Sequence, residues 1–258
     1  MLFAFDLDKT LVTDDYRLPD RVGAAVRSLR DAGHRVTVLT GRPLASARRF
    51  LDELDIDGPF SVNHGAQVFD RGGAPLRRVQ LKAADVRLLV DPWHAHPLVE
   101  FSCIIDDVLL VKDPRDERWR WAHTESRVVT RFDPAAAPDA DKVVFASSTS
   151  PAIDAHVATH LPHVERYLWG DGFLEVIGAG ADKGTALAFI AERLGVPRRD
   201  VIAFGDGLND ASMLRWAGYA VAVGPDAHAH ALAAADEHVA SPEVGGVADW
   251  IDRFLVRA

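Results

Sequence analysis

Two short apolar segments near the amino terminus, each ending in a polar loop, constrain the fold more than any other feature of this sequence. Residues 2–5 are Leu-Phe-Ala-Phe and stop at Asp6, and residues 34–39 form a second such run that stops at Thr40. Apolar side chains recur at helical spacing between these runs and again after the second one. Buried strands that alternate with amphipathic helices form right-handed βαβ units with parallel strands. The sequence therefore predicts an α/β fold with a Rossmann-like parallel sheet.

The carboxyl-terminal third repeats this pattern. Asp182 is placed to cap a helix whose apolar residues share one face, and Gly195 marks the end of that helix. Residues 201–204 form another short apolar run, followed by the polar sequence Gly-Asp-Gly-Leu-Asn-Asp. A further apolar segment at 219–223 and an amphipathic stretch at 247–256 complete the predicted α/β layers.

The middle of the chain has a different character. Helical segments that carry tryptophans alternate there with strand-like runs at 108–111 and 142–145. Prolines predict breaks in this pattern at Pro92, Pro97, Pro114, Pro134 and Pro138. We interpret residues 82–177 as an α+β domain inserted into the parallel sheet. Residues 1–81 and 178–258 then form the core domain.

Charge and composition exclude several classes of protein. The 258 residues include 29 Lys and Arg against 38 Asp and Glu, which gives a net charge of −9 without a basic cluster. Binding to nucleic-acid phosphates depends on clustered positive charge, so we expect neither nucleic acid nor a membrane surface as a partner. The single cysteine, Cys103, excludes a disulfide within the chain and a cysteine-based zinc site. Because no apolar run approaches the roughly 18 residues of a membrane span, we expect a cytoplasmic protein.

Side chains with carboxylate, hydroxyl, amide or ammonium groups gather where the predicted strands end or the late helix begins: Asp6, Asp8, Thr40, Lys183, Asp206, Asn209 and Asp210. In a doubly wound sheet, ligands bind at the carboxyl ends of the strands. Carboxylates that converge there repel one another unless a cation lies between them, and an all-oxygen donor set favours Mg²⁺. A metal beside a carboxylate, a lysine and a threonine hydroxyl is suited to a phosphoryl group.

These residues lie in four motifs that resemble those of the haloacid dehalogenase (HAD) superfamily of phosphatases. In chain order, the motifs are Asp-Leu-Asp-Lys-Thr-Leu at 6–11, Leu-Thr-Gly-Arg at 39–42, Lys-Gly at 183–184 and Gly-Asp-Gly-Leu-Asn-Asp at 205–210. The large insert between the second and third motifs is similar to that of Cof-type members, in which it is a C2 cap. The resemblance covers nearly the whole chain. It implies a HAD-type catalytic core and a cap that excludes water and reads the leaving group.

The resemblance also implies a role for each motif residue. Asp6 would be the nucleophile that forms an aspartyl-phosphate, and Asp8 would protonate the leaving oxygen and then activate water. Lys183 would steady Asp6 and the transferred charge, and Asn209 would orient Lys183 or the phosphate. The implied phosphate and substrate contacts are Thr40, Gly41, Arg42, His64, Lys183 and Asn209. The implied Mg²⁺ ligands are Asp6, the main-chain carbonyl of Asp8, Asp206 and Asp210.

Two positions depart from the pattern that the resemblance implies. Lys9 stands where the superfamily commonly has glycine, which affects the backbone freedom of the loop but leaves both aspartates in place. The sequence Asn63-His64-Gly65-Ala66 stands where many Cof-type members have Asn-Gly-Ala. His-Gly-Ala is similar to a segment of trehalose-phosphate phosphatases, and this favours a sugar phosphate as the substrate.

The sequence thus predicts a Mg²⁺-dependent phosphatase, monomeric or homodimeric, that acts on a small phosphorylated metabolite. A phosphomutase or phosphotransferase that uses the same aspartyl-phosphate is the nearest alternative. A phospho-accepting signalling module also gathers carboxylates, a threonine and a lysine around Mg²⁺, but such a module has no use for the long insert or for an acid/base at Asp8. A catalytically silent binding protein is a third alternative, which the intact motifs disfavour.

Overall fold

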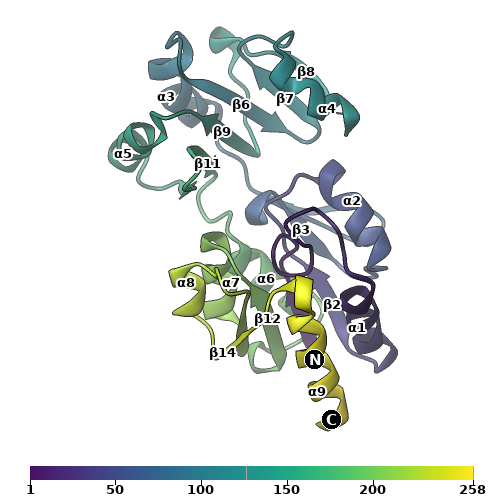
Figure 1. Cartoon of the computed structure of the whole chain (residues 1–258). Coiled ribbons are helices and arrows are strands. Elements are labelled where there is room, and N and C mark those ends of the chain that lie inside the picture. The colour runs from purple at the N-terminus through teal and green to yellow at the C-terminus, as the bar shows by residue number, and fades with distance from the viewer. Residues whose placement is uncertain (126, 258) are drawn as a thin grey trace. The chain divides into compact units, whose positions relative to one another are not determined.

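The chain forms two compact units, which the computed structural model describes over residues 1–125 and 127–257 (Figure 1). The first unit, here called the core unit, comprises Met1–Arg42, Ala47–Arg77 and the chain from Asp182 onward. The second, the insert unit, comprises Pro43–Ser46 and Arg78–Ala181. Each unit has its own sheet and its own apolar core.

A five-stranded, fully parallel sheet forms the centre of the core unit. Its strands, in spatial order, are β14 (Glu237–Val239), β13 (Tyr219–Val223), β12 (Val201–Gly205), β1 (Leu2–Phe5) and β2 (Arg35–Val38). Phe5 pairs with Phe204 on one side and with Val38 on the other, so β12, β1 and β2 end at the same level. The residues that follow these strands must therefore meet at one edge of the sheet.

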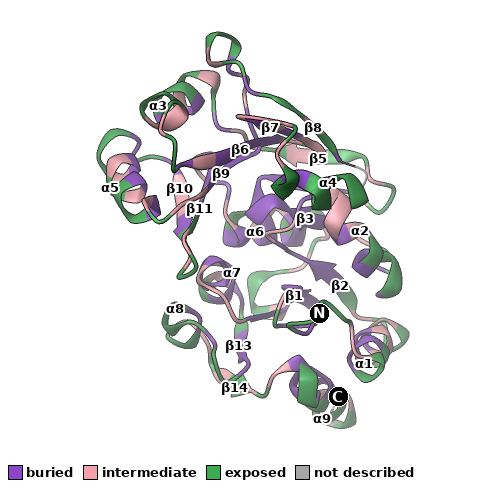
Figure 2. Ribbon diagram, turned by 45° about the horizontal axis from the view of Figure 1, so that its top comes forward, coloured by how far each residue is buried: buried purple, intermediate pink, exposed green. Residues whose placement is uncertain are grey.

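Helices cover both faces of this sheet, because successive side chains of a strand point to opposite faces. On one face, α6 (Lys183–Arg193), α7 (Ala211–Trp216) and α8 (Ala229–Leu232) pack their apolar residues against Leu2, Ala4 and Ala203. On the other face, α9 (Gly246–Arg257) contacts α1 (Asp20–Asp31), and its Trp250 and Phe254 pack edge-on against Phe3. Figure 2 shows β1, β2 and β13 largely buried and the outer sides of these helices exposed. The predicted α/β class with a parallel sheet is confirmed.

A small three-stranded sheet was not predicted. Its order is β3 (Phe60–Val62), β4 (Gln67–Phe69) and β5 (Pro75–Arg78), with β3 antiparallel to β4. A single bridge between Leu39 and Ser61 links β3 to the chain just after β2. The short helical turn η1 (Asn63–Gly65) joins β3 to β4 and carries His64.

The insert unit contains a six-stranded sheet in which only the β7–β8 pair is parallel. The spatial order is β10 (Glu165–Leu168), β11 (Phe173–Ile177), β9 (Lys142–Ala146), β6 (Glu100–Ile105), β7 (Val108–Val111) and β8 (Val128–Arg131). Helices α3 (Ala83–His94) and α5 (Ser150–His160) pack on one face around Phe101, Phe145 and the buried Cys103. Trp119 and Ala122, from η2 (Glu117–Trp119) and α4 (Arg120–Thr124), pack with Leu109 in a separate cluster.

One of the predicted proline breaks is wrong. Pro92 lies inside α3, which continues to His94. Proline removes one backbone hydrogen bond from a helix. Here the helix ends only two residues after Pro92, so only a short part of α3 follows the missing bond. Pro97, Pro114 and Pro138 lie outside helices and strands as predicted.

The remaining regular elements are α2 (Leu44–Glu53) and four short helical turns: η3 (Pro134–Ala136), η4 (Arg198–Asp200), η5 (Leu208–Asp210) and η6 (Pro242–Val244). Within the described part of the chain, no helix combines the length and the apolar composition that crossing a membrane would require.

Candidate active site

Lys183 and Asp6 form a buried ion pair at the edge of the core sheet. Asp6 directly follows β1, and Lys183 is the first residue of α6, whose start is fixed by a capping box between Asp182 and Thr185. The fully buried Lys183 donates hydrogen bonds from Nζ to Oδ1 of Asp6 at 2.6 Å and to Oδ1 of Asp210 at 2.5 Å. The structure thus brings together three of the predicted site residues from distant parts of the sequence.

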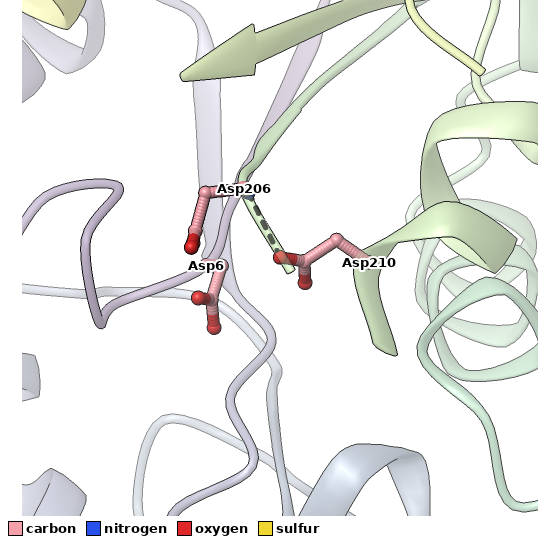
Figure 3. A group of neighbouring side chains, drawn as sticks. All are labelled: Asp6, Asp206 and Asp210. Atoms are coloured by element: carbon pink, nitrogen blue, oxygen red, sulfur yellow. Dashed lines mark hydrogen bonds between the residues drawn. The ribbon is translucent and has the colours of Figure 1, made fainter. Parts of the chain in front are cut away.

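Asp206 and Asp210 belong to the loop and helical turn that follow β12. The second carboxylate oxygen of Asp210 accepts hydrogen bonds from the backbone N–H groups of Asp206 and Gly207, at 3.0 and 2.8 Å. Asp206 accepts one from the hydroxyl of Thr10 at 3.1 Å. Figure 3 shows Asp6, Asp206 and Asp210 converging, and carboxylate oxygens of all three lie within 4.8 Å of one another.

Burial and mutual repulsion perturb the pKa values of this cluster. Loss of solvent, followed by the nearby charge of Asp210, raises the pKa of Asp6 well above its ordinary value and that of Asp206 to about 7. Burial alone would lower the pKa of Lys183, but the charges of Asp210 and Asp6 outweigh it, so that Lys183 stays protonated. With all groups ionised, one ammonium faces three carboxylates, a local charge of 1 − 3 = −2. An all-oxygen donor set with this charge deficit fits a hard divalent cation.

The carboxylate of Asp8 lies outside this cluster and pairs with Arg42. Arg42 donates from Nε to Oδ2 of Asp8 at 2.9 Å and from Nη2 to Oδ1 at 2.5 Å, which is a bidentate geometry. The loop can turn here because Lys9 adopts a left-handed backbone conformation with φ of 57°. Glycine adopts this conformation most easily, which explains in physical terms why glycine is expected at this position.

His64 connects two loops of the site. Its backbone N–H bonds the carbonyl of Thr40 at 3.0 Å, and its ring Nδ1 lies 3.0 Å from the amide nitrogen of Asn209. The ring also covers Gly41, since a Cβ atom at residue 41 would lie 2.3 Å from Cε1 of His64. The hydroxyl of Thr40 accepts a hydrogen bond from the N–H of Arg42 at 3.1 Å. Within the described residues, the side chain of Asn209 thus bonds His64 rather than Lys183.

The predicted site residues lie in loops, in short helical turns or, for Lys183, at the start of α6, at one edge of the parallel sheet: Asp6, Asp8, Thr40, Gly41, Arg42, His64, Lys183, Asp206, Asn209 and Asp210. Thr10 was missed, although a hydroxyl two residues after Asp8 in the same loop was a usable signal. Tyr16 and Phe50, which contact Arg42, were also missed, and nothing in the sequence pattern distinguishes them.

The core unit has a parallel sheet with buried carboxylates and a lysine at its carboxyl edge, and the insert unit interrupts its sequence. This combination is typical of one class of hydrolases. The family model described as haloacid dehalogenase-like hydrolase matches residues 3–251, and the chain belongs to this family. The predicted superfamily and the prediction of an enzyme are thereby confirmed.

Known relatives are similar over nearly the whole chain. The sequence is 29% identical over 267 aligned positions to 5-amino-6-(5-phospho-D-ribitylamino)uracil phosphatase YitU of Bacillus subtilis, covering 98% of this chain and 97% of the relative. It is 28% identical to the HMP-PP phosphatase of Serratia proteamaculans, covering 86% and 83% of the two chains. A solved haloacid dehalogenase-like hydrolase from Bacteroides thetaiotaomicron has the same fold, with a TM-score of 0.84, 23% identity and 98% coverage of both chains.

Proposed function

We propose that this protein is a Mg²⁺-dependent phosphatase that hydrolyses the phosphate monoester of a small metabolite through a phosphorylated Asp6. The observation that carries this proposal is the buried contact of Lys183 with Asp6 beside two further carboxylates. A buried carboxylate held by an ammonium, with excess negative charge next to it, suits a nucleophile that works with a divalent cation.

In the first step, a carboxylate oxygen of Asp6 attacks phosphorus and the bond from phosphorus to the leaving oxygen breaks. Asp8 gives a proton to that oxygen, so the product leaves as an alcohol. Lys183 holds Asp6 in one orientation and offsets the charge of the transferred group. The hydroxyl of Thr40 accepts a bond from Arg42, which leaves its proton free to bind a phosphoryl oxygen together with the N–H of Gly41.

In the second step, water attacks phosphorus and the oxygen of Asp6 is the leaving group. Asp8, now ionised, takes the proton from this water, so that the enzyme returns to its starting state with one phosphate released. Asp6, Asp206 and Asp210, with the main-chain carbonyl of Asp8, would hold Mg²⁺, which when bound supplies positive charge beside the phosphoryl group.

The proposed substrate is a small phosphorylated metabolite, and within that class a sugar phosphate or a similar polyol phosphate. The name of the Bacillus relative includes a phosphorylated ribityl group, and the Serratia relative is named as a phosphatase of HMP-PP. The net charge of −9 disfavours nucleic acid and membrane surfaces as partners. We assign substrate selection to the insert unit, which would act as the cap. We further propose that the enzyme is cytoplasmic and monomeric or homodimeric.

A phosphate-release screen tests this function. The purified protein with Mg²⁺ would be offered sugar, nucleotide, glycerol and cofactor phosphates, alongside the Asp6→Asn variant and a matched Asp52→Asn variant at an exposed position of α2. We expect release by the wild type and by Asp52→Asn, and none by Asp6→Asn. No release from any compound, or equal release by Asp6→Asn, would contradict the proposal. An isomerised ester in place of free phosphate would instead indicate a phosphomutase.

A further inference from the structure

The guanidinium of Arg42 lies over two aromatic rings, those of Tyr16 and Phe50. Its central carbon is 5.1 Å from the ring centre of Tyr16 and 5.0 Å from that of Phe50, and its side chain is only 15% exposed. The nitrogens at its edge donate the two hydrogen bonds to Asp8. A guanidinium next to aromatic rings still has its hydrogen-bond donors in its own plane, and Arg42 uses two of them to hold Asp8.

Tyr16 has properties that stability alone does not explain. It is 62% exposed, so burial of its ring contributes little to folding. Its backbone has a φ of 59°, in the left-handed region that an aromatic residue rarely adopts. This conformation is held by a hydrogen bond from its N–H to the carbonyl of Thr13 at 2.9 Å and by one from Arg49 to its own carbonyl at 2.8 Å. Among the described residues, Arg42 is the one cation that lies over the face of its ring.

We propose that Tyr16 is a positioning residue, which together with Phe50 forms an aromatic clamp that holds Arg42 in the geometry that orients Asp8. This inference rests on the proposed function, because the orientation of Asp8 matters only if Asp8 transfers protons. A strained, exposed aromatic residue is maintained here because its ring limits the motion of Arg42. The clamp thereby fixes a side chain that must reach the leaving oxygen in one step and water in the next.

The clamp predicts a specific kinetic signature. A residue that orients an acid and base acts in the transition state, so its loss lowers kcat and leaves KM unchanged. The loss of kcat/KM, which reports transfer of the phosphoryl group to Asp6, is greater for an alkyl phosphate, whose leaving oxygen needs a proton, than for an aryl phosphate, whose leaving oxygen needs little help. A merely structural role would instead lower the melting temperature and affect both substrates equally.

Three variants separate these roles. Tyr16→Asn removes the ring and tolerates the left-handed backbone, Tyr16→Phe keeps the ring, and Arg17→Ala alters a neighbouring exposed residue of the same loop. For Tyr16→Asn we expect kcat with an alkyl phosphate to fall about tenfold or more, with KM and melting temperature unchanged. Tyr16→Phe restores wild-type kcat, and Arg17→Ala does not alter it. An unchanged or higher kcat in Tyr16→Asn, or equal losses of kcat/KM for both esters, would overturn the proposal.

A second measurement does not depend on phosphatase activity. The hydrogen on Nε of Arg42 bonds to Asp8, and the ring of Tyr16 lies beside the same guanidinium. Its exchange with solvent, followed by NMR, should therefore be slow in the wild type and in Tyr16→Phe and faster in Tyr16→Asn. If the wild type releases no phosphate, the proposed function fails, and the exchange rate alone then shows whether Tyr16 restrains Arg42. Equal exchange in the wild type and Tyr16→Asn would overturn the clamp even in an active enzyme.

Discussion

Nζ of Lys183 lies 2.6 Å from Oδ1 of Asp6, although 177 positions separate the two residues in the sequence. One is the first residue of α6 and the other directly follows β1, so the contact exists only when helix and sheet are packed. Both side chains are buried, which strengthens their interaction and makes the loss of either partner costly.

Replacing Lys183 should therefore affect both stability and catalysis. In Lys183→Met, the carboxylates of Asp6 and Asp210 lose their shared counter-charge. We expect the free energy of unfolding of the metal-free protein to fall by about 3 kcal/mol and kcat to fall about 100-fold or more. Urea unfolding in EDTA and phosphate-release assays measure the two effects. The exposed Lys82→Met variant is the control, and matching values for the two variants would refute the role of the buried pair.

The raised pKa of Asp206 predicts how stability depends on pH. Its pKa is about 7 in the folded protein against 3.8 ordinarily, so between these values the folded state holds more protons than the unfolded state. Stability without metal should therefore decline as pH rises from about 4 to 7, by on the order of 1 kcal/mol per pH unit, and level off above. The raised pKa of Asp6 acts in the same direction. Unfolding in EDTA at several pH values tests this, and Asp206→Asn should show a shallower decline. Identical profiles would speak against it.

Mg²⁺ binding should release protons over the same range. A metal binds the ionised carboxylates, so its affinity should rise with pH until about 7, where Asp206 ionises. Calorimetric titration with Mg²⁺ in buffers of different ionisation heat counts the protons released. An affinity for Mg²⁺ that did not change between pH 5.5 and 7.5 would contradict binding at this cluster.

Gly41 and His64 should be energetically coupled. A methyl group at residue 41 would collide with the buried ring of His64, so Gly41→Ala should lower the free energy of unfolding by about 1–3 kcal/mol and reduce kcat. The same change should cost less in a His64→Ala background, where the obstructing ring is absent. A double-mutant cycle measures the difference, and strictly additive effects would show that the ring does not restrict residue 41.

Much of the core unit could be predicted because its signals are local. The apolar run at 219–223 has the same bounds as β13, and Asp182 caps α6 as its position predicted. Convergence of the site residues followed from one general property, that parallel strands end at the same edge of a sheet. Four short motifs were therefore enough to indicate which side chains would meet.

Other features depend on contacts that local patterns do not report. The strands of the small sheet around η1 have three or four residues each, too few for a clear periodicity. The pairing of Arg42 with Asp8 spans 34 positions, and the clamp around it requires Tyr16 in a backbone conformation that its residue type does not favour. The bond between His64 and Asn209 spans 145 positions. Packing in three dimensions determines each of these contacts.

Trapping the phosphorylated intermediate tests the central claim most directly. In Asp8→Asn, p-nitrophenyl phosphate can still react, because nitrophenolate leaves without an acid, but hydrolysis of the intermediate lacks its base. We predict that this variant with Mg²⁺ gains one phosphoryl group by intact mass, that hydroxylamine removes it, and that peptide mapping places it on Asp6. Asp6→Asn should gain none. The account would be contradicted if the wild type releases phosphate but the Asp8→Asn variant gains no phosphoryl group. It would also be contradicted if that variant carries the group on a residue other than Asp6.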